Sequence, residues 1–336
     1  MPGPRESAPR SPAVNRRRAL TAVLALAAGP ALLAACGSGA AVEDTAPVGA
    51  ADGPKINIGP DQHRVRAAKN AKAAALLPAR VRATGELRVG VAAESSPPLT
   101  FYATDDRTLI GVETDLATLV ADALGLRLRL EPLSWENLFV GLDSGKLDAV
   151  FSNVTVTEER KEKYDFATYR RDELAVEARK GTAWRVRGAA DVAGRTIAVG
   201  TATNQEKILL EWSAENVKAG RRPVDIRYYP KTSDTYLALQ SGRIDAYFGP
   251  NPSVVYHVNT AGRTQSIGRF SGGGDAVQGK IAATTKKGSG LVGAYAAALR
   301  AVIADGSYRT VLDRWGLGAE ALTTSQINPP GLPRTH

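Results

Sequence analysis

The fold is decided by the stretch Leu142-Asp143-Ser144-Gly145-Lys146-Leu147-Asp148-Ala149-Val150-Phe151, which recurs 97 residues later as Leu239-Gln240-Ser241-Gly242-Arg243-Ile244-Asp245-Ala246-Tyr247-Phe248. Each copy predicts the end of a helix, a glycine that stops it, and then a strand. A second pair of strand-like runs, Leu87–Val91 and Arg195–Val199, lies at a similar offset. The simplest account is two α/β lobes of similar plan, and chance similarity of a common helix-to-strand turn is the alternative.

Short strands alternate with amphipathic helices around the repeat, which indicates an α/β architecture. Residues 113–124 predict a helix that stops at Gly125 and is followed by a strand over 126–130. After the second copy, a strand at 280–284 and helices reaching Trp315 predict a return to the first lobe. We therefore assign 85–176 and 277–325 to lobe 1 and 177–276 to lobe 2. Lobes whose strands open toward each other form a ligand cleft.

The beginning of the chain is typical of an export signal. Arg16-Arg17-Arg18 precede an apolar run that ends in Leu33-Ala34-Ala35-Cys36. This pattern resembles a bacterial lipoprotein signal, which implies that residues 1–35 are removed and that Cys36 carries lipid such as palmitate. The expected location is the extracytoplasmic side of the cell membrane. An ordinary signal peptide and a buried alanine-rich helix are the alternatives, and the export route, including a twin-arginine route, stays open.

Two further segments are expected before the folded body. Residues 36–60 are rich in Gly, Ala, Pro and Asp and predict a flexible tether. Residues 61–84 form a helical extension, with an alanine-rich helix from Val65 to Leu77 that stops at Pro78. No apolar run after Cys36 approaches the roughly 18 residues that a membrane span requires. The chain is therefore expected to be tethered to the membrane rather than to span it.

Composition excludes several classes of function. Residues 1–35 hold five arginines and one glutamate, and so carry four of the nine net positive charges. Later basic residues lie among acidic ones, as in Arg170-Arg171-Asp172-Glu173, without the clustered basic face that nucleic acid requires. The single cysteine leaves the folded part without an intramolecular disulfide. We expect no nucleic-acid partner and a monomer stabilised by its core.

The sequence offers no catalytic or cofactor motif. His63, His257 and His336 are scattered and match no metal-ligand spacing. There is no nucleophile elbow, phosphate loop or dinucleotide fingerprint. We expect no catalytic residue, no metal and no cofactor.

The most informative stretch for chemistry is Ser152-Asn153-Val154-Thr155-Val156-Thr157-Glu158-Glu159-Arg160. A strand ending in small polar residues, including Asn153, is followed by a helical turn that would place Arg160 over the end of the strand. With the Thr155 hydroxyl and nearby backbone N–H groups, Arg160 would form a bidentate carboxylate receptor. A solvated arginine within the charge run 158–163 is the alternative.

Together with Gly111-Val112-Glu113-Thr114-Asp115-Leu116 and Trp135, this stretch resembles family 3 extracellular solute-binding proteins, the receptor subunits of polar amino-acid ABC importers. The resemblance covers about residues 85–320. It implies a type II periplasmic-binding-protein-like fold, a carboxylate-bearing ligand such as a polar amino acid, and delivery to an ABC permease. A ligand-sensing lipoprotein and a dehydratase-like enzyme on the same fold are the alternatives.

The resemblance also implies further ligand-binding residues. Trp135 would form an aromatic wall, with packing in the core as the alternative. Thr203 and Asn204 would offer donors to the carboxylate. Where relatives usually carry an aspartate for the ligand ammonium, this chain has Pro250. Asn251 and Glu94 are the candidates to replace it.

Overall fold

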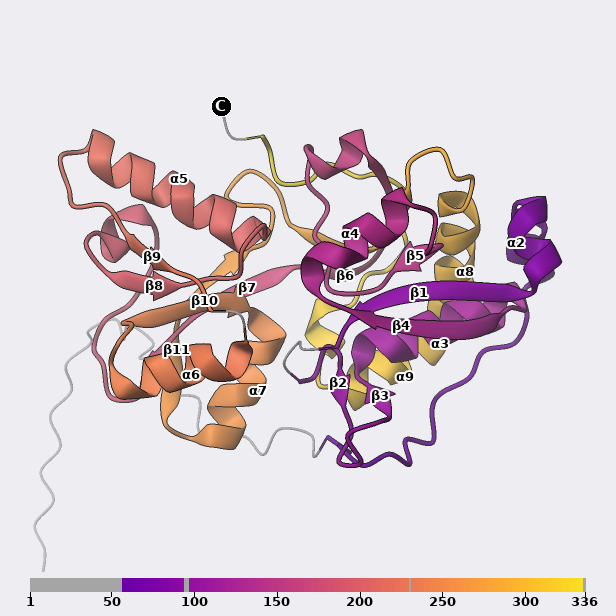
Figure 1. Cartoon of the computed structure of the whole chain (residues 1–336), viewed down its shortest axis with the longest axis horizontal. Helices are drawn as coiled ribbons and strands as arrows, with labels where there is room; N and C mark the ends of the chain where they lie inside the picture. The colour runs from indigo at the N-terminus through magenta and orange to yellow at the C-terminus, as the bar shows by residue number, and fades with distance from the viewer. Residues whose placement is uncertain (1–55, 94–96, 230, 335–336) are drawn as a thin grey trace, which may run out of the picture. The chain divides into compact units, whose positions relative to one another are not determined.

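The computed structural model describes residues 56–93, 97–229 and 231–334 (Figure 1). Within these residues the strands form two mixed sheets and a short hairpin. The first sheet has the order β4-β1-β5-β12-β6, from strands β1 (Glu86–Ala92), β4 (Arg127–Leu133), β5 (Ala149–Val150), β6 (Tyr164–Arg171) and β12 (Lys280–Lys286). The second has the order β11-β7-β10-β8-β9, from β7 (Glu173–Arg179), β8 (Thr196–Ala198), β9 (Asp225–Arg227), β10 (Ala246–Pro250) and β11 (Thr264–Ser271). The hairpin pairs β2 (Phe101–Tyr102) with β3 (Leu109–Ile110).

Helices cover both faces of the first sheet. Helices α3 (Val112–Leu124), α8 (Val292–Ala304) and α9 (Ser307–Arg314) share one apolar core with it, and α4 (Trp135–Asp143) packs in a second core on the other face. The predicted helix over 113–124 is confirmed: α3 is buried on almost every side and ends at Gly125, whose left-handed backbone, with φ of 68°, favours glycine.

Each face of the second sheet is likewise covered. Helix α5 (Asn204–Lys218) packs against it through Ile208, Leu209 and Trp212. Helix α6 (Thr232–Ser241) contributes Ala238 and Leu239 to a separate cluster. Helix α7 (Asn251–Ala261) lies against β7, β10 and β11. The remaining short turns are η1 (Arg160–Glu162), η2 (Ala189–Val192) and η3 (Gly318–Glu320).

The two copies of the repeat occupy equivalent places in the two sheets. One follows α4 into β5, which is parallel to β1, and the other follows α6 into β10, which is parallel to β8. In each copy an aspartate at the start of the strand accepts a backbone N–H from the neighbouring strand. Asp148 accepts from Arg88 at 3.1 Å, and Asp245 accepts from Thr196 at 2.9 Å.

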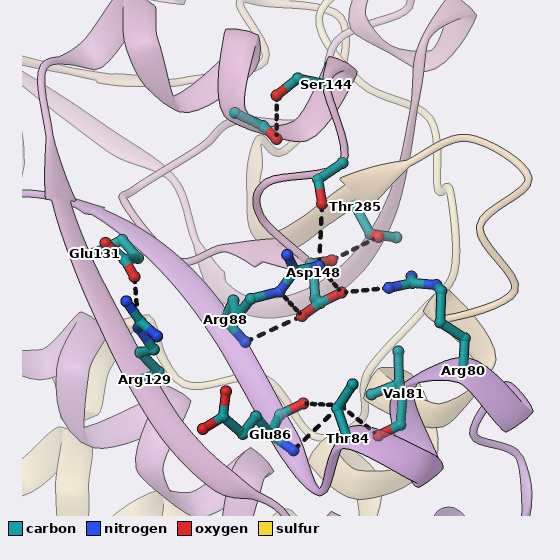
Figure 2. A network of polar contacts seen from close by, with 12 residues as sticks. Arg80, Val81, Thr84, Glu86, Arg88, Arg129, Glu131, Ser144, Asp148 and Thr285 are labelled. Atoms are coloured by element: carbon teal, nitrogen blue, oxygen red, sulfur yellow. Dashed lines mark hydrogen bonds and ion pairs between the residues drawn. The ribbon is translucent and has the colours of Figure 1, made fainter.

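The aspartate of the first copy is the centre of a larger polar network, which Figure 2 shows. The Arg88 side chain donates to both carboxylate oxygens of Asp148 at 2.9 Å, and Arg80 donates at 3.2 Å. Burial by itself raises the pKa of Asp148, but the hydrogen bonds from the two arginines outweigh it and lower that pKa below its usual range. Thr285 Oγ1 on β12 donates to the Asp148 carbonyl at 2.8 Å. The network therefore ties α2 (Ala79–Thr84), β1 and β12 to the repeat.

The chain passes from the first sheet to the second at Asp172, between β6 and β7, and returns between β11 and β12. The first boundary between the lobes, predicted at residue 176, falls within β7. The apolar pattern of β7 does not by itself indicate which sheet the strand joins. In the structure β7 pairs with β10 and β11, so the whole strand belongs to the second sheet.

The N-terminal extension contains less helix than predicted. Instead of one helix over 65–77, the structure has α1 (Ala71–Ala75) and α2. The residues before Asn70 run along α3, because Arg66 Nε donates to Asp122 at 2.7 Å and Arg64 pairs with Asp115. Asn70 then caps α1 by accepting the Ala73 N–H at 3.0 Å.

A C-terminal strap, residues 326–334, lies beyond the predicted end of lobe 1. Its backbone bonds to the first lobe: the Thr168 N–H donates to the Gln326 carbonyl at 3.0 Å, and the Leu332 N–H donates to Val156 at 3.1 Å. The Leu332 side chain is only 2% exposed and joins the core of the second sheet. The strap is therefore a third connection between the lobes, in addition to the two chain crossings.

Candidate functional site

A cavity of about 430 Å³ lies where the carboxyl ends of strands from both sheets meet. The segments after β1, β4 and β5 line it from the first sheet, and those after β8, β9 and β10 line it from the second. This is the position at which α/β sheets bind ligands. The cavity is large enough for a small organic solute.

The lining is aromatic with neutral polar groups between the rings. The rings belong to Trp135, Tyr228, Tyr229, Tyr247 and Phe248. Among the lining residues that the structure describes, Glu136 carries the only formal charge, and its side chain is exposed. The aromatic walls can therefore stack on a ligand. Hydrogen bonds from amides, hydroxyls and groups at the cavity's edge must fix the orientation of that ligand.

Arg160 lies at this edge rather than in the lining. Its guanidinium donates to the Thr155 carbonyl at 3.0 Å and to the Ala202 carbonyl, from the loop between β8 and α5, at 3.1 Å. The guanidinium carbon lies 5.4 Å from the ring centre of Trp135. Burial lowers the pKa of Arg160 to about 10, so the side chain keeps its charge at neutral pH. Arg160 is thus a fixed cation that bridges the two lobes beside the cavity.

The predicted donors Thr155 and Asn204 converge on a residue that sequence reasoning missed. Thr155 Oγ1 donates to Asp172 Oδ2 at 2.7 Å, and Asn204 Nδ2 donates to the same oxygen at 3.1 Å. Burial raises the pKa of Asp172 to about 6. A Cβ at Gly272 would collide with this carboxylate, so glycine is required there. Asn204 lines the cavity, whereas Thr155 lies behind it.

Three other predicted residues divide between cavity and interior. Asn153 lines the cavity with a left-handed backbone, φ 53°, and its side-chain oxygen accepts from Arg170. Thr203 lines it and caps α5, accepting the Glu206 N–H at 3.2 Å. Asn251 does not reach the cavity, because it is buried between Glu320 and Arg269. Glu94 and Cys36 lie outside the described residues.

Behind the cavity lies a buried ionic network that was not predicted from the sequence. Arg170 is fully buried and pairs with Glu113 and Glu320. Burial by itself lowers the pKa of Arg170, but these two carboxylates raise it above its usual value. Glu320 also accepts from Asn251 Nδ2 at 3.2 Å, which links the network to α7. The place of Arg170 and Asp172 at a strand-to-strand crossing was the signal that could have indicated burial.

Within the described residues, no group of three or more His, Cys, Asp or Glu side chains could hold a metal ion. His257 instead lies 2.5 Å from the buried carboxylate of Glu177. No helix in this part of the chain is long and apolar enough to cross a membrane.

Comparison with known proteins agrees with this architecture. Residues 87–318 match the model of bacterial extracellular solute-binding proteins, family 3, and the chain belongs to this family. The predicted two-lobed α/β fold is confirmed, and so is the predicted class, a binding protein rather than an enzyme.

Individual relatives give the extent of the likeness. The L-cystine-binding protein TcyJ of Escherichia coli (strain K12) is 36% identical over 168 residues, which span 50% of this chain and 59% of TcyJ. The L-cystine-binding protein TcyA of Bacillus subtilis (strain 168) is 27% identical over 238 residues, 70% of this chain and 83% of TcyA. The structure of an ancestral arginine-binding protein bound to arginine matches with a TM-score of 0.59 and 27% identity, covering 69% of this chain and 98% of that one.

Proposed function

We propose that this chain is the substrate-binding subunit of an amino-acid ABC importer and that it binds a polar amino acid in the cavity between its lobes. The observation that carries the proposal is the cavity of about 430 Å³, with aromatic walls from both sheets and the charged Arg160 at its edge. An aromatic wall suits the body of the solute, and a fixed guanidinium suits its carboxylate. Relatives named for cystine and arginine support the choice of an amino acid.

L-Cystine is the first amino acid to test. Arginine carries one more cation than carboxylates, whereas each of the two ammonium groups of cystine is accompanied by a carboxylate of the ligand itself. Glu136 is the lone carboxylate among the described lining residues. A buried cation without a carboxylate partner is costly. Cystine instead presents a polarizable disulfide, and sulfur makes favourable contacts with aromatic rings.

The remaining parts of the proposal concern location and partner. Cys36 would carry the lipid that holds the protein on the extracytoplasmic side of the cell membrane, and an ABC permease would receive the solute. The lipobox-like tetrapeptide that ends at Cys36 supports the anchor, and the family supports the permease.

The test is a thermal-shift and calorimetry panel of the twenty common amino acids plus L-cystine, with dipeptides and dicarboxylates as controls. A ligand that binds only the folded state raises the melting temperature with its concentration. We expect L-cystine at millimolar or lower concentration to raise it, and cysteine kept reduced to raise it less. If no amino acid shifts the melting temperature while another solute does, the proposed ligand class is wrong.

A further inference from the structure

Two buried polar atoms of cavity-lining residues have no hydrogen-bond partner. They are the amide oxygen Oε1 of Gln205 and the indole nitrogen Nε1 of Trp135. Buried polar atoms in native proteins are nearly always paired, so an unpaired atom in a ligand cavity indicates a partner that the ligand supplies. One of these atoms accepts a hydrogen bond and the other donates one.

The two residues come from elements on different lobes. Gln205 is the second residue of α5, directly after Asn204, and is only 5% exposed. Trp135 is the first residue of α4, and its ring packs edge-on against Phe139 with centroids 5.2 Å apart. Both side chains therefore rest on regular elements, which fixes their positions.

Neighbouring polar groups of the lining already have partners. Ser152 Oγ accepts the Ala92 N–H at 2.9 Å, Thr203 Oγ1 donates to the Gly200 carbonyl at 2.7 Å, and Asn204 binds Asp172. Glu136 is exposed, Pro250 has no polar side-chain atom, and Asn251 is buried away from the cavity. Of the side-chain oxygens of the described lining residues, Gln205 Oε1 is the one that is both buried and without a hydrogen-bond partner.

We infer that Gln205 Oε1 accepts a hydrogen bond from the amino group of the bound solute and that the indole N–H of Trp135 donates one to a solute oxygen. This inference rests on the proposed function, since it assigns the amine and oxygen contacts of that same cavity. The site would then recognise a zwitterion, and the protein group that accepts from the ammonium group would be a neutral amide oxygen. The negative charge of Asp172 lies one hydrogen bond behind, through Asn204, and favours the same cation.

The acceptor role is tested with Gln205→Glu and Gln205→Leu, and the matched control is Gln240→Glu on the exposed side of α6. The probes are L-cystine and 3,3′-dithiodipropionate, which has the same disulfide and carboxylates but no amino groups. If another amino acid of the panel binds more tightly, it and its deaminated analogue are used. Calorimetry at pH 7.5 gives each dissociation constant, and circular dichroism confirms the fold.

For Gln205→Leu we expect at least tenfold weaker binding of the amino acid and less than twofold change for the deaminated probe. Gln205→Glu adds a negative charge without changing the size of the side chain. The variant should therefore bind the amino acid more tightly and the deaminated dicarboxylate more weakly. The control should leave both unchanged. If Gln205→Leu does not fold, Gln205→Glu decides by itself. Equal effects on both probes, or none on either, overturn the inference while leaving the proposed function intact.

The donor role is tested with Trp135→Phe, which keeps an aromatic wall and removes the N–H group. Both probes carry carboxylates, so both should lose at least fivefold in affinity. Unchanged affinity for both removes Trp135 from the inference. If the wild-type protein binds no amino acid, the proposed function fails first, and this inference fails with it.

Discussion

Asn204 Nδ2 donates to Asp172 Oδ2 at 3.1 Å and so joins the first residue of α5 to the residue at which the chain passes between the sheets. Thr155 Oγ1 donates to the same oxygen at 2.7 Å. One buried carboxylate thereby holds the loop after the first repeat copy and the helix of the second lobe. Two of the polar groups predicted to meet a ligand, Thr155 and Asn204, therefore bind an acceptor that belongs to the protein itself.

Asp172→Asn should make stability less sensitive to pH. Burial raises the pKa of Asp172 from 3.8 to about 6, so the folded protein holds this proton more tightly than the unfolded chain. Its stabilising contribution is therefore full below pH 3.8 and is lost as the pH rises through 6. This difference in pKa between the unfolded and the folded protein corresponds to a loss of about 3 kcal/mol in the free energy of unfolding. Urea unfolding at pH 4, 6 and 8 should show that the free energy of unfolding of the variant increases relative to that of wild type as the pH rises.

The matched control for this series is Asp275→Asn, at an exposed position. It should follow wild type at every pH. A difference between Asp172→Asn and wild type that stays constant from pH 4 to 8 would show that Asp172 does not titrate as described.

Arg160→Ala should weaken amino-acid binding. The guanidinium is held beside the cavity by two carbonyl groups. Loss of one partner of a charge pair that the bound ligand buries costs roughly 2–5 kcal/mol, or about 30-fold to several thousand-fold in affinity. Arg160→Lys keeps the charge but loses the planar fork, so its effect should be intermediate. Calorimetry on the tightest amino acid of the panel measures both, with exposed Arg187→Ala as control. A loss below a few-fold rejects the carboxylate-binding role.

Leu332→Ala should destabilise the protein by about 2–5 kcal/mol, because it empties a buried position in the core of the second lobe. Ile327→Ala is the control within the same strap, since Ile327 is 44% exposed and should cost less than about 1 kcal/mol. Denaturant unfolding compares the two. Equal costs would mean that the strap does not fasten the second lobe.

Glu320→Ala should cost about 3–5 kcal/mol, because it leaves the buried Arg170 with a single carboxylate partner, Glu113. The comparison is Asp313→Ala, which breaks the solvent-exposed pair with Arg309 and should cost much less than Glu320→Ala, because water screens that pair. Thermal and urea unfolding give both values. A cost for Glu320→Ala as small as for Asp313→Ala contradicts an energetically important network.

Cys36→Ala should release the protein from the membrane fraction, because the chain has no other cysteine to carry lipid. Fractionation and immunoblotting measure the distribution, and circular dichroism of the released protein checks the fold. Membrane retention equal to wild type would show that something other than Cys36 holds the protein there.

Local patterns were sufficient to predict much of the architecture from sequence. The period of α3, its glycine stop and the repeated helix-to-strand turn are properties of neighbouring residues, and each is found where the pattern placed it. The aromatic wall residue Trp135 and the loop residues Asn153, Thr203 and Asn204 also line the cavity, because residues that follow strands in both lobes meet at one edge.

The sequence by itself determined the two-lobed α/β fold, its repeat and the family, since these depend on periodicity and on short motifs. Only the tertiary structure decided which charged residues are buried. Arg170 and Asp172 stand in a run of four charges that looks solvated, and burial is possible only because Glu113, Glu320, Thr155 and Asn204 arrive from distant segments to pair with them. A charge can be buried at a tolerable cost only when such partners surround it. The residues next to a charge in the sequence do not show which distant residues will pair with it.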